Sequence, residues 1–178
     1  MSDPRAELFE SLIQVTASEV KRNNPQLQFD VSSYKVKIDE IIQQTCRQLG
    51  EQNVQKIVTA VNNQALLSHI IQICMQQMQN ITRDGKIDLD DTSYFLDAIR
   101  QIYEEIDAAR QQPQTALDVK ITTTDLMTMA GFLLKLVLTY TIKDPQALDS
   151  SLRICHSAIL LATFSLTPVT FSWKWKCC

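Results

Sequence analysis

The sequence predicts an all-α protein, a multi-helix bundle of about six helices with a short extended C-terminal arm. Apolar residues recur with the 3.6-residue period of amphipathic helices along most of the chain. The 178 residues include only three glycines and five prolines, whereas turn-dense β folds need more of both. The apolar content of 45% and the charged content of 21% are typical of a globular domain. We therefore expect a helical bundle domain over residues 1–166 and an extended aromatic and basic tail over 167–178.

The first half of the chain predicts three helices with recognisable ends. Asp3 and Pro4 are typical of a helix start, with Asp as the N-cap and Pro at the first helical position. Gly50 follows the second apolar stripe and indicates its C-terminal end. The third stripe is the longest and could break at Asn62 and Asn63. The three helices are expected over about 4–23, 33–49 and 52–79.

The second half predicts three more helices. A turn at Gly85 precedes the first of them. Thr122 and Asp125 have the spacing of a capping box, and Asp144 with Pro145 repeats the start signal found near the N-terminus. These helices are expected over about 91–110, 122–143 and 145–166.

Residues 80–91, between two expected helices, resemble the twelve-residue EF-hand calcium loop. Oxygen-bearing residues fall at the spacing of its ligands, and a glycine occupies the position of the sharp turn. The register departs from the pattern at position one, which is not Asp, and at position twelve, which lacks the long bidentate Glu. The simpler interpretation is a tight turn followed by a helix cap. The candidate calcium ligands are Asn80, Thr82, Asp84, Lys86 (through its carbonyl), Asp88 and Asp91.

Two long apolar segments lie in the C-terminal third, over 126–142 and 154–173. Each is near the length that spans a bilayer, so a membrane-anchored adaptor is one interpretation. Lys135 would lie in the middle of the first span, which is costly, and the second contains His156 and several hydroxyl groups. The favoured interpretation is a pair of central, mostly buried helices.

The end of the chain has the period-two alternation of a strand. Apolar and aromatic residues alternate there with polar and basic ones. Such a segment could add to the sheet edge of a partner, where main-chain hydrogen bonds supply affinity and aromatic side chains supply anchors. The candidate partner-binding residues are Val169, Phe171, Trp173, Lys174, Trp175 and Lys176.

The final Cys177 and Cys178 resemble the prenylation signal of Rab-type GTPases, but the chain has no Gly-rich phosphate loop. Reversible acylation and a disulfide to a neighbouring copy are alternatives, and exposed terminal thiols are the simpler interpretation. The other three cysteines, including Cys46, lack metal-site spacing and are expected to be core residues. A reducing, intracellular compartment is expected, because the N-terminus is polar and charged rather than a signal peptide.

The composition argues against several function classes. The net charge of −3 and scattered basic residues predict no nucleic-acid surface. His69 and His156 are the two histidines, and both are expected on apolar helix faces rather than in a catalytic arrangement. We therefore expect no enzyme activity.

The leading hypothesis is a non-enzymatic interaction or assembly subunit of a larger complex, such as a minor structural protein of a virion shell or a component of a multi-subunit organelle complex. Other protein subunits would bind to the apolar C-terminal third and its tail. A membrane-anchored adaptor and a calcium-responsive helix–loop–helix protein are the alternatives, and no other cofactor is expected.

Overall fold

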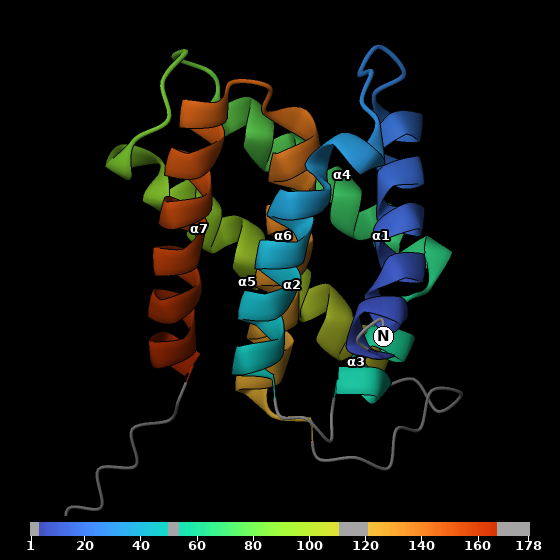
Figure 1. Ribbon diagram of the computed structural model, residues 1–178. Helices are drawn as coiled ribbons and strands as arrows, with labels where there is room; N and C mark the ends of the chain where they lie inside the picture. The colour runs from blue at the N-terminus through green and yellow to red at the C-terminus, as the bar shows by residue number, and fades with distance from the viewer. Residues whose placement is uncertain (1–3, 50–53, 111–120, 167–178) are drawn as a thin grey trace, which may run out of the picture.

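The computed structural model describes residues 4–49, 54–110 and 121–166, which form seven α-helices and two short 3-10 helices (Figure 1). The all-α prediction is confirmed. The expected C-terminal arm and the domain boundary at residue 166 concern residues outside this part of the chain. The elements are α1 (Pro4–Asn23), η1 (Val31–Tyr34), α2 (Lys35–Gln48), α3 (Val54–Val61), α4 (Gln64–Ile81), η2 (Leu89–Asp91), α5 (Thr92–Arg110), α6 (Thr123–Thr141) and α7 (Pro145–Leu166).

The predicted helix starts in the second half of the chain are confirmed by their hydrogen bonds. At α6, the Asp125 amide donates to the Thr122 hydroxyl at 3.1 Å, and the Thr122 amide donates to the Asp125 carboxylate at 3.2 Å. At α7, the Ala147 amide donates to Asp144 Oδ2 at 2.8 Å. These side chains satisfy amide groups that have no partner within the helix.

The segment expected as one long helix over 52–79 is two helices, α3 and α4. The helix is interrupted at Asn62 and Asn63, where Asn63 Oδ1 accepts a hydrogen bond from the Leu66 amide and so caps α4. Asparagine is favoured at the N-cap because its side-chain oxygen accepts a hydrogen bond from a backbone amide that has no partner within the helix. Inside a helix the same side chain competes with the helical hydrogen bonds. The described part of the bundle therefore has seven helices where about six were expected.

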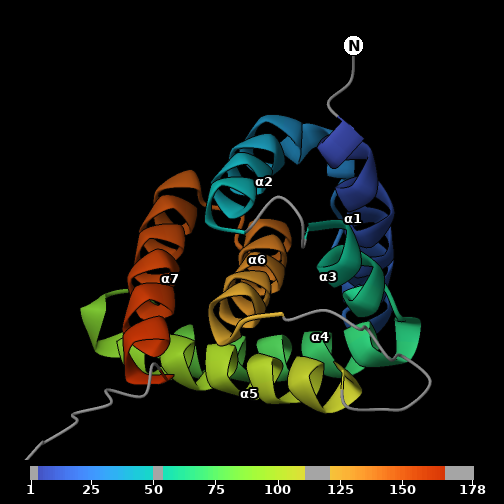
Figure 2. The same cartoon turned by 90° about the horizontal axis from the view of Figure 1, so that it is seen from below.

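Helix α6 lies at the centre of the bundle and packs against each of the other six described helices. Figure 2 shows it enclosed by α2, α7, α5 and the α1–α3 side. Every residue from Asp125 to Tyr140 is buried. Its threonines are accommodated because their hydroxyls donate to carbonyls one turn earlier, as Thr139 does to Lys135 at 2.8 Å.

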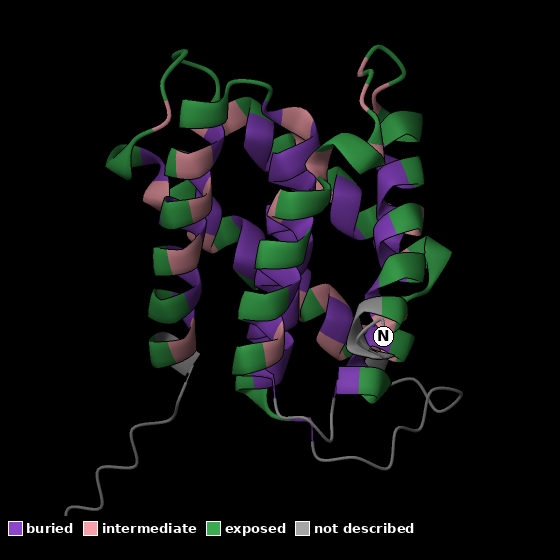
Figure 3. Cartoon of the chain, in the orientation of Figure 1, coloured by how far each residue is buried: buried purple, intermediate pink, exposed green. Residues whose placement is uncertain are grey.

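Helix α7 lies on the outside and packs on α6 and α5. Figure 3 shows a buried side facing the bundle and an exposed side facing solvent. The contact with α6 is close at Gly131, where an added Cβ would overlap Cδ1 and Cγ1 of Ile159. Glycine at this position therefore sets how near the two helices approach.

Candidate functional site

The residues predicted to bind a partner, Val169 to Lys176, lie outside the described residues, and their role stays a prediction. The structure instead shows the helix that leads into them. Helix α7 ends at Leu166, immediately before this tail. The candidate site is therefore built from the C-terminal end of α7.

The residues predicted as calcium ligands form local hydrogen bonds. Asn80 lies in the last turn of α4 and donates to Gln77 Oε1 at 3.2 Å, while the Thr82 hydroxyl donates to the Met78 carbonyl at 2.8 Å. Asp84 Oδ1 accepts from the Lys86 amide at 3.0 Å. These contacts close the turn after α4, with Gly85 in the left-handed region at φ +76°.

Asp88 and Asp91 meet in a capping box at the start of η2. The Asp90 amide donates to Asp88 Oδ1 at 2.9 Å, and the Asp88 amide donates to Asp91 Oδ2 at 3.0 Å. Burial raises the pKa of the Asp91 carboxyl above its ordinary value, and the nearby Asp88 carboxylate adds to this effect. The described residues contain no cluster of three or more His, Cys, Asp or Glu side chains arranged to hold a metal ion. This arrangement is the predicted turn and cap, and calcium binding here stays a prediction.

The two apolar segments have different places in the fold. Residues 126–142 form most of α6, at the centre of the bundle, and residues 154–166 form the second half of α7. No helix in the described residues has the length and hydropathy needed to cross a membrane.

The solvent-facing side of α7 changes from polar to apolar along its length. Exposed positions from residue 146 to residue 157 carry polar or charged side chains, among them Gln146, Ser150, Arg153 and Ser157. The same side continues with apolar side chains one and two turns later. These are Leu160, 45% exposed, Leu161, 52% exposed, and Phe164, 74% exposed. We call these three residues the α7 patch.

The spacing of the α7 patch follows helix geometry. Leu160 and Phe164 are four residues apart and Leu161 and Phe164 are three apart, so the side chains share one face. The other large exposed hydrophobic residues of the described chain lie singly on other elements. They are Val36 on α2, Leu89 on η2 and Tyr94 on α5. Single exposed apolar residues are ordinary, whereas a grouped set indicates an interaction surface.

Sequence reasoning placed the adhesive segment in the C-terminal third but did not single out this patch. The signal was present, because Leu160 and Phe164 fall away from the apolar stripe of Ile154, Ala158 and Ala162 on a helical wheel, and Leu161 falls at its edge. This helix was interpreted as central and mostly buried, whereas the structure places one side of it at the surface.

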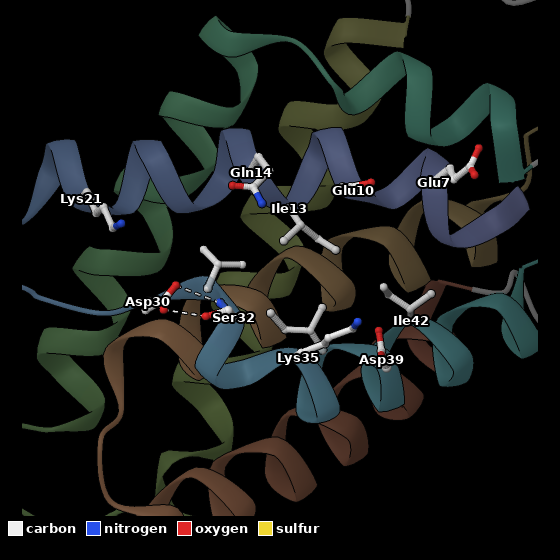
Figure 4. A pocket seen from close by; sticks show the side chains of 12 residues that line it. Glu7, Glu10, Ile13, Gln14, Lys21, Asp30, Ser32, Lys35, Asp39 and Ile42 are labelled. Carbon is white, nitrogen blue, oxygen red and sulfur yellow. Dashed lines mark hydrogen bonds between the residues drawn. The ribbon is translucent and has the colours of Figure 1, made fainter. Parts of the chain in front are cut away.

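A groove of about 610 Å³ lies between α1 and α2 (Figure 4). Its apolar floor is formed by Ile13 of α1 with Ile38 and Ile42 of α2, all buried. The polar side chains around it are all exposed. Lys35 and other rim groups can therefore reach water without any ligand, and the groove has no buried polar group that would select one.

The two histidines do not behave alike. His69 was expected on an apolar face, but its side chain is 68% exposed and its Nδ1 lies 3.7 Å from Glu105 Oε2. The apolar stripe predicted for this helix was wide enough to include position 69. The buried face of α4 is narrower, and its residues include Leu67, Ile70 and Ile71. His156 is half-buried on α7.

No protein-family model, curated protein or solved structure matches this chain. The assignment of the candidate site is therefore based on the residues of this chain alone.

Proposed function

We propose that this chain is a non-enzymatic interaction or assembly subunit that binds another protein through the α7 patch and the tail that follows it. The observation that supports this proposal is the change from polar to apolar residues along one solvent-facing side of α7. Burying an exposed leucine or phenylalanine on a partner contributes about 1.5–3 kcal/mol when the whole side chain is transferred from water. Three partly exposed side chains on one face therefore favour association.

The size of the patch indicates that it is only part of the binding surface. A stable protein interface buries about 800 Å² on each partner, which is more than three side chains supply. The residues that follow in the sequence, Val169 to Trp175, carry the alternating aromatic side chains predicted to dock on a sheet edge. Patch and tail together would provide a surface of ordinary interface size with aromatic anchors.

Site-specific photo-crosslinking in the cell of origin tests this proposal. A photoreactive residue is placed in the full chain at Leu161 and, in a separate variant, at Val36. Val36 is the matched control, because it is an exposed apolar residue, 75% exposed, that lies alone on α2. We expect a discrete protein adduct from position 161 that position 36 does not give.

Removing residues 167–178 provides the second arm of the experiment. If patch and tail bind as one surface, the adduct at position 161 should weaken strongly in the shortened chain, while its thermal unfolding is unchanged. The same adducts at both positions would contradict the proposal. So would a lipid adduct at position 161, which is the outcome that the membrane-adaptor alternative requires.

A further inference from the structure

A cleft of about 580 Å³ lies between α2, α6 and α7, apart from the α7 patch. Figure 2 shows α2 and α7 on two neighbouring sides of α6. Small-molecule sites commonly have volumes of about 300–1,000 Å³. The cleft is lined by Lys37, Glu40, Ile41 and Gln44 of α2, by Lys135 of α6, and by Asp149, Leu152, Arg153, His156 and Ser157 of α7.

Lys135 is the unusual member of this lining. It is 3% exposed, on a helix that is otherwise almost entirely uncharged. Among the described residues its ammonium has no hydrogen-bond or ion-pair partner. Removing an ammonium from water costs several kcal/mol unless an opposite charge or hydrogen bonds compensate. Desolvation accordingly lowers the pKa of Lys135 from its ordinary value.

The carboxylates of the cleft are already paired with another lysine. Lys37 Nζ lies 3.1 Å from Asp149 Oδ1 and 3.3 Å from Glu40 Oε2. The hydrogen bond with Asp149 raises the pKa of Lys37, so this group stays charged at neutral pH. The lining thus holds Lys37, Lys135 and Arg153 against two carboxylates, which leaves one positive charge in excess.

Two further groups beside Lys135 do not neutralise it. Burial raises the pKa of the Cys155 thiol to about 12, so the thiol is uncharged at pH 7. Burial also lowers the pKa of the His156 imidazole, with a smaller contribution from the Lys135 charge. His156 Nδ1 is buried and has no hydrogen-bond partner among the described residues. Neither group therefore provides a negative charge that would pair with the Lys135 ammonium.

We propose that this cleft binds a small anion, a carboxylate or phosphate group, which accepts hydrogen bonds from the Lys135 ammonium. Such a group would supply the partner that the Lys135 ammonium lacks. Ile41 and Leu152 provide apolar contact for the remainder of an organic ligand. This site is separate from the α7 patch and does not depend on the proposed function.

Calorimetric titration of the full chain tests this site. Inorganic phosphate and the six-carbon carboxylate hexanoate are titrated separately, with sodium chloride holding the ionic strength constant. The proteins compared are the wild type, Lys135→Met and Lys56→Met. Lys56 is an exposed lysine on α3 that does not line the cleft, and methionine keeps the length of the lysine side chain without its charge.

We expect saturable one-site binding of at least one probe to the wild type, which Lys135→Met weakens by about tenfold or more and Lys56→Met leaves unchanged. Binding of phosphate alone would identify a phosphoryl ligand, and binding of hexanoate alone a carboxylate ligand. Failure of both probes to bind, or equal binding to Lys135→Met, would overturn the proposal.

A measurement on the wild type avoids any dependence on how the variant folds. The Cε–Hε resonance of Lys135 is followed by NMR during the same titration. It should shift with the midpoint found by calorimetry while the Lys56 resonance stays in place. A Lys135 resonance that does not move while the probe binds would place the ligand elsewhere and contradict the assignment.

Discussion

Helices α6 and α7 are neighbours in the sequence and look alike there, since both are long and rich in apolar residues. In the structure, α6 is buried on all sides by the other described helices, whereas α7 has an outer side that faces solvent. The apolar residues of α6 are accounted for by the core. Those of the α7 patch are not, because they lie on the side turned away from it. Apolar residues of similar appearance in the sequence thus belong to the core in α6 and to the surface in the α7 patch.

The largest expected effect comes from truncating one leucine on each helix. Leu133 is fully buried on α6, so Leu133→Ala should lower the free energy of unfolding by about 2–5 kcal/mol through lost burial and the cavity left behind. Leu161→Ala should change it by less than about 1 kcal/mol, because Leu161 is half exposed. Urea unfolding of both variants gives the two values. Similar losses of unfolding free energy in the two variants would contradict the assignment of Leu133 to the core and Leu161 to the surface.

The next largest effect on stability is expected at Lys135, the charged residue in the middle of α6. Because the Lys135 side chain is largely buried and no carboxylate of the described residues pairs with it, Lys135→Met should raise the free energy of unfolding of the ligand-free protein at pH 7 by about 1–4 kcal/mol. Chemical denaturation in a buffer without phosphate or carboxylates measures it. Lys56→Met should leave stability unchanged, and a stability loss in Lys135→Met would mean that the ammonium is satisfied.

The pH dependence of this difference has a definite sign. Desolvation lowers the pKa of Lys135 in the folded state below its ordinary value of 10.5. Between the two pKa values the unfolded chain binds more protons, so this residue makes the wild-type protein more stable as pH rises through that window. The advantage of Lys135→Met over wild type should therefore shrink as pH approaches 10.5. An advantage that grows with pH would contradict the assigned direction.

The contact between the two helices provides a third test. Gly131→Ala places a Cβ against the Ile159 side chain, and we expect it to destabilise the protein by about 1–3 kcal/mol through overpacking. Ile159→Ala removes the opposing atoms, so the double variant should lose less stability than the two single variants added together. Strict additivity in a double-mutant cycle would show that the helices are not held this closely.

The smallest effect concerns the Tyr140 hydroxyl of α6. It is buried and has no hydrogen-bond partner among the described residues, while its ring stacks on Phe29 with centroids 4.7 Å apart. Tyr140→Phe keeps the stacking and removes the unsatisfied group, so stability should rise by about 1 kcal/mol. Thermal unfolding checks this, with the exposed Tyr94→Phe as the control that should not change. A fall in stability would reveal a partner for the hydroxyl.

Local signals in the sequence were enough to predict much of the fold. The capping box of Thr122 and Asp125, the start at Pro145 and the turn at Gly85 each depend on residues a few positions apart, and all three appear in the structure. The sequence indicated the separation of α3 from α4 only as a possible break at Asn63. Asparagine occurs both at helix caps and inside helices, so its presence does not decide between the two.

The candidate sites depend on contacts that the sequence does not reveal. The pairing of Lys37 with Asp149 joins residues 112 positions apart, and both residues line the same cleft as Lys135. In the sequence, Lys135 was only an argument against a membrane span. The α7 patch likewise becomes apparent once α6 is known to occupy the centre, because that decides which side of α7 faces inward.

We propose that the α7 patch binds a partner and does not hold the fold together. Quantitative co-purification from the cell of origin, with the full chain as wild type, Leu161→Lys and Val36→Lys, tests it most directly when paired with thermal unfolding of each protein. We expect Leu161→Lys to unfold at the wild-type temperature and to lose about tenfold or more of its co-purifying protein, whereas Val36→Lys keeps both properties. A stably folded Leu161→Lys variant that retains the same protein at the wild-type level would contradict the claim.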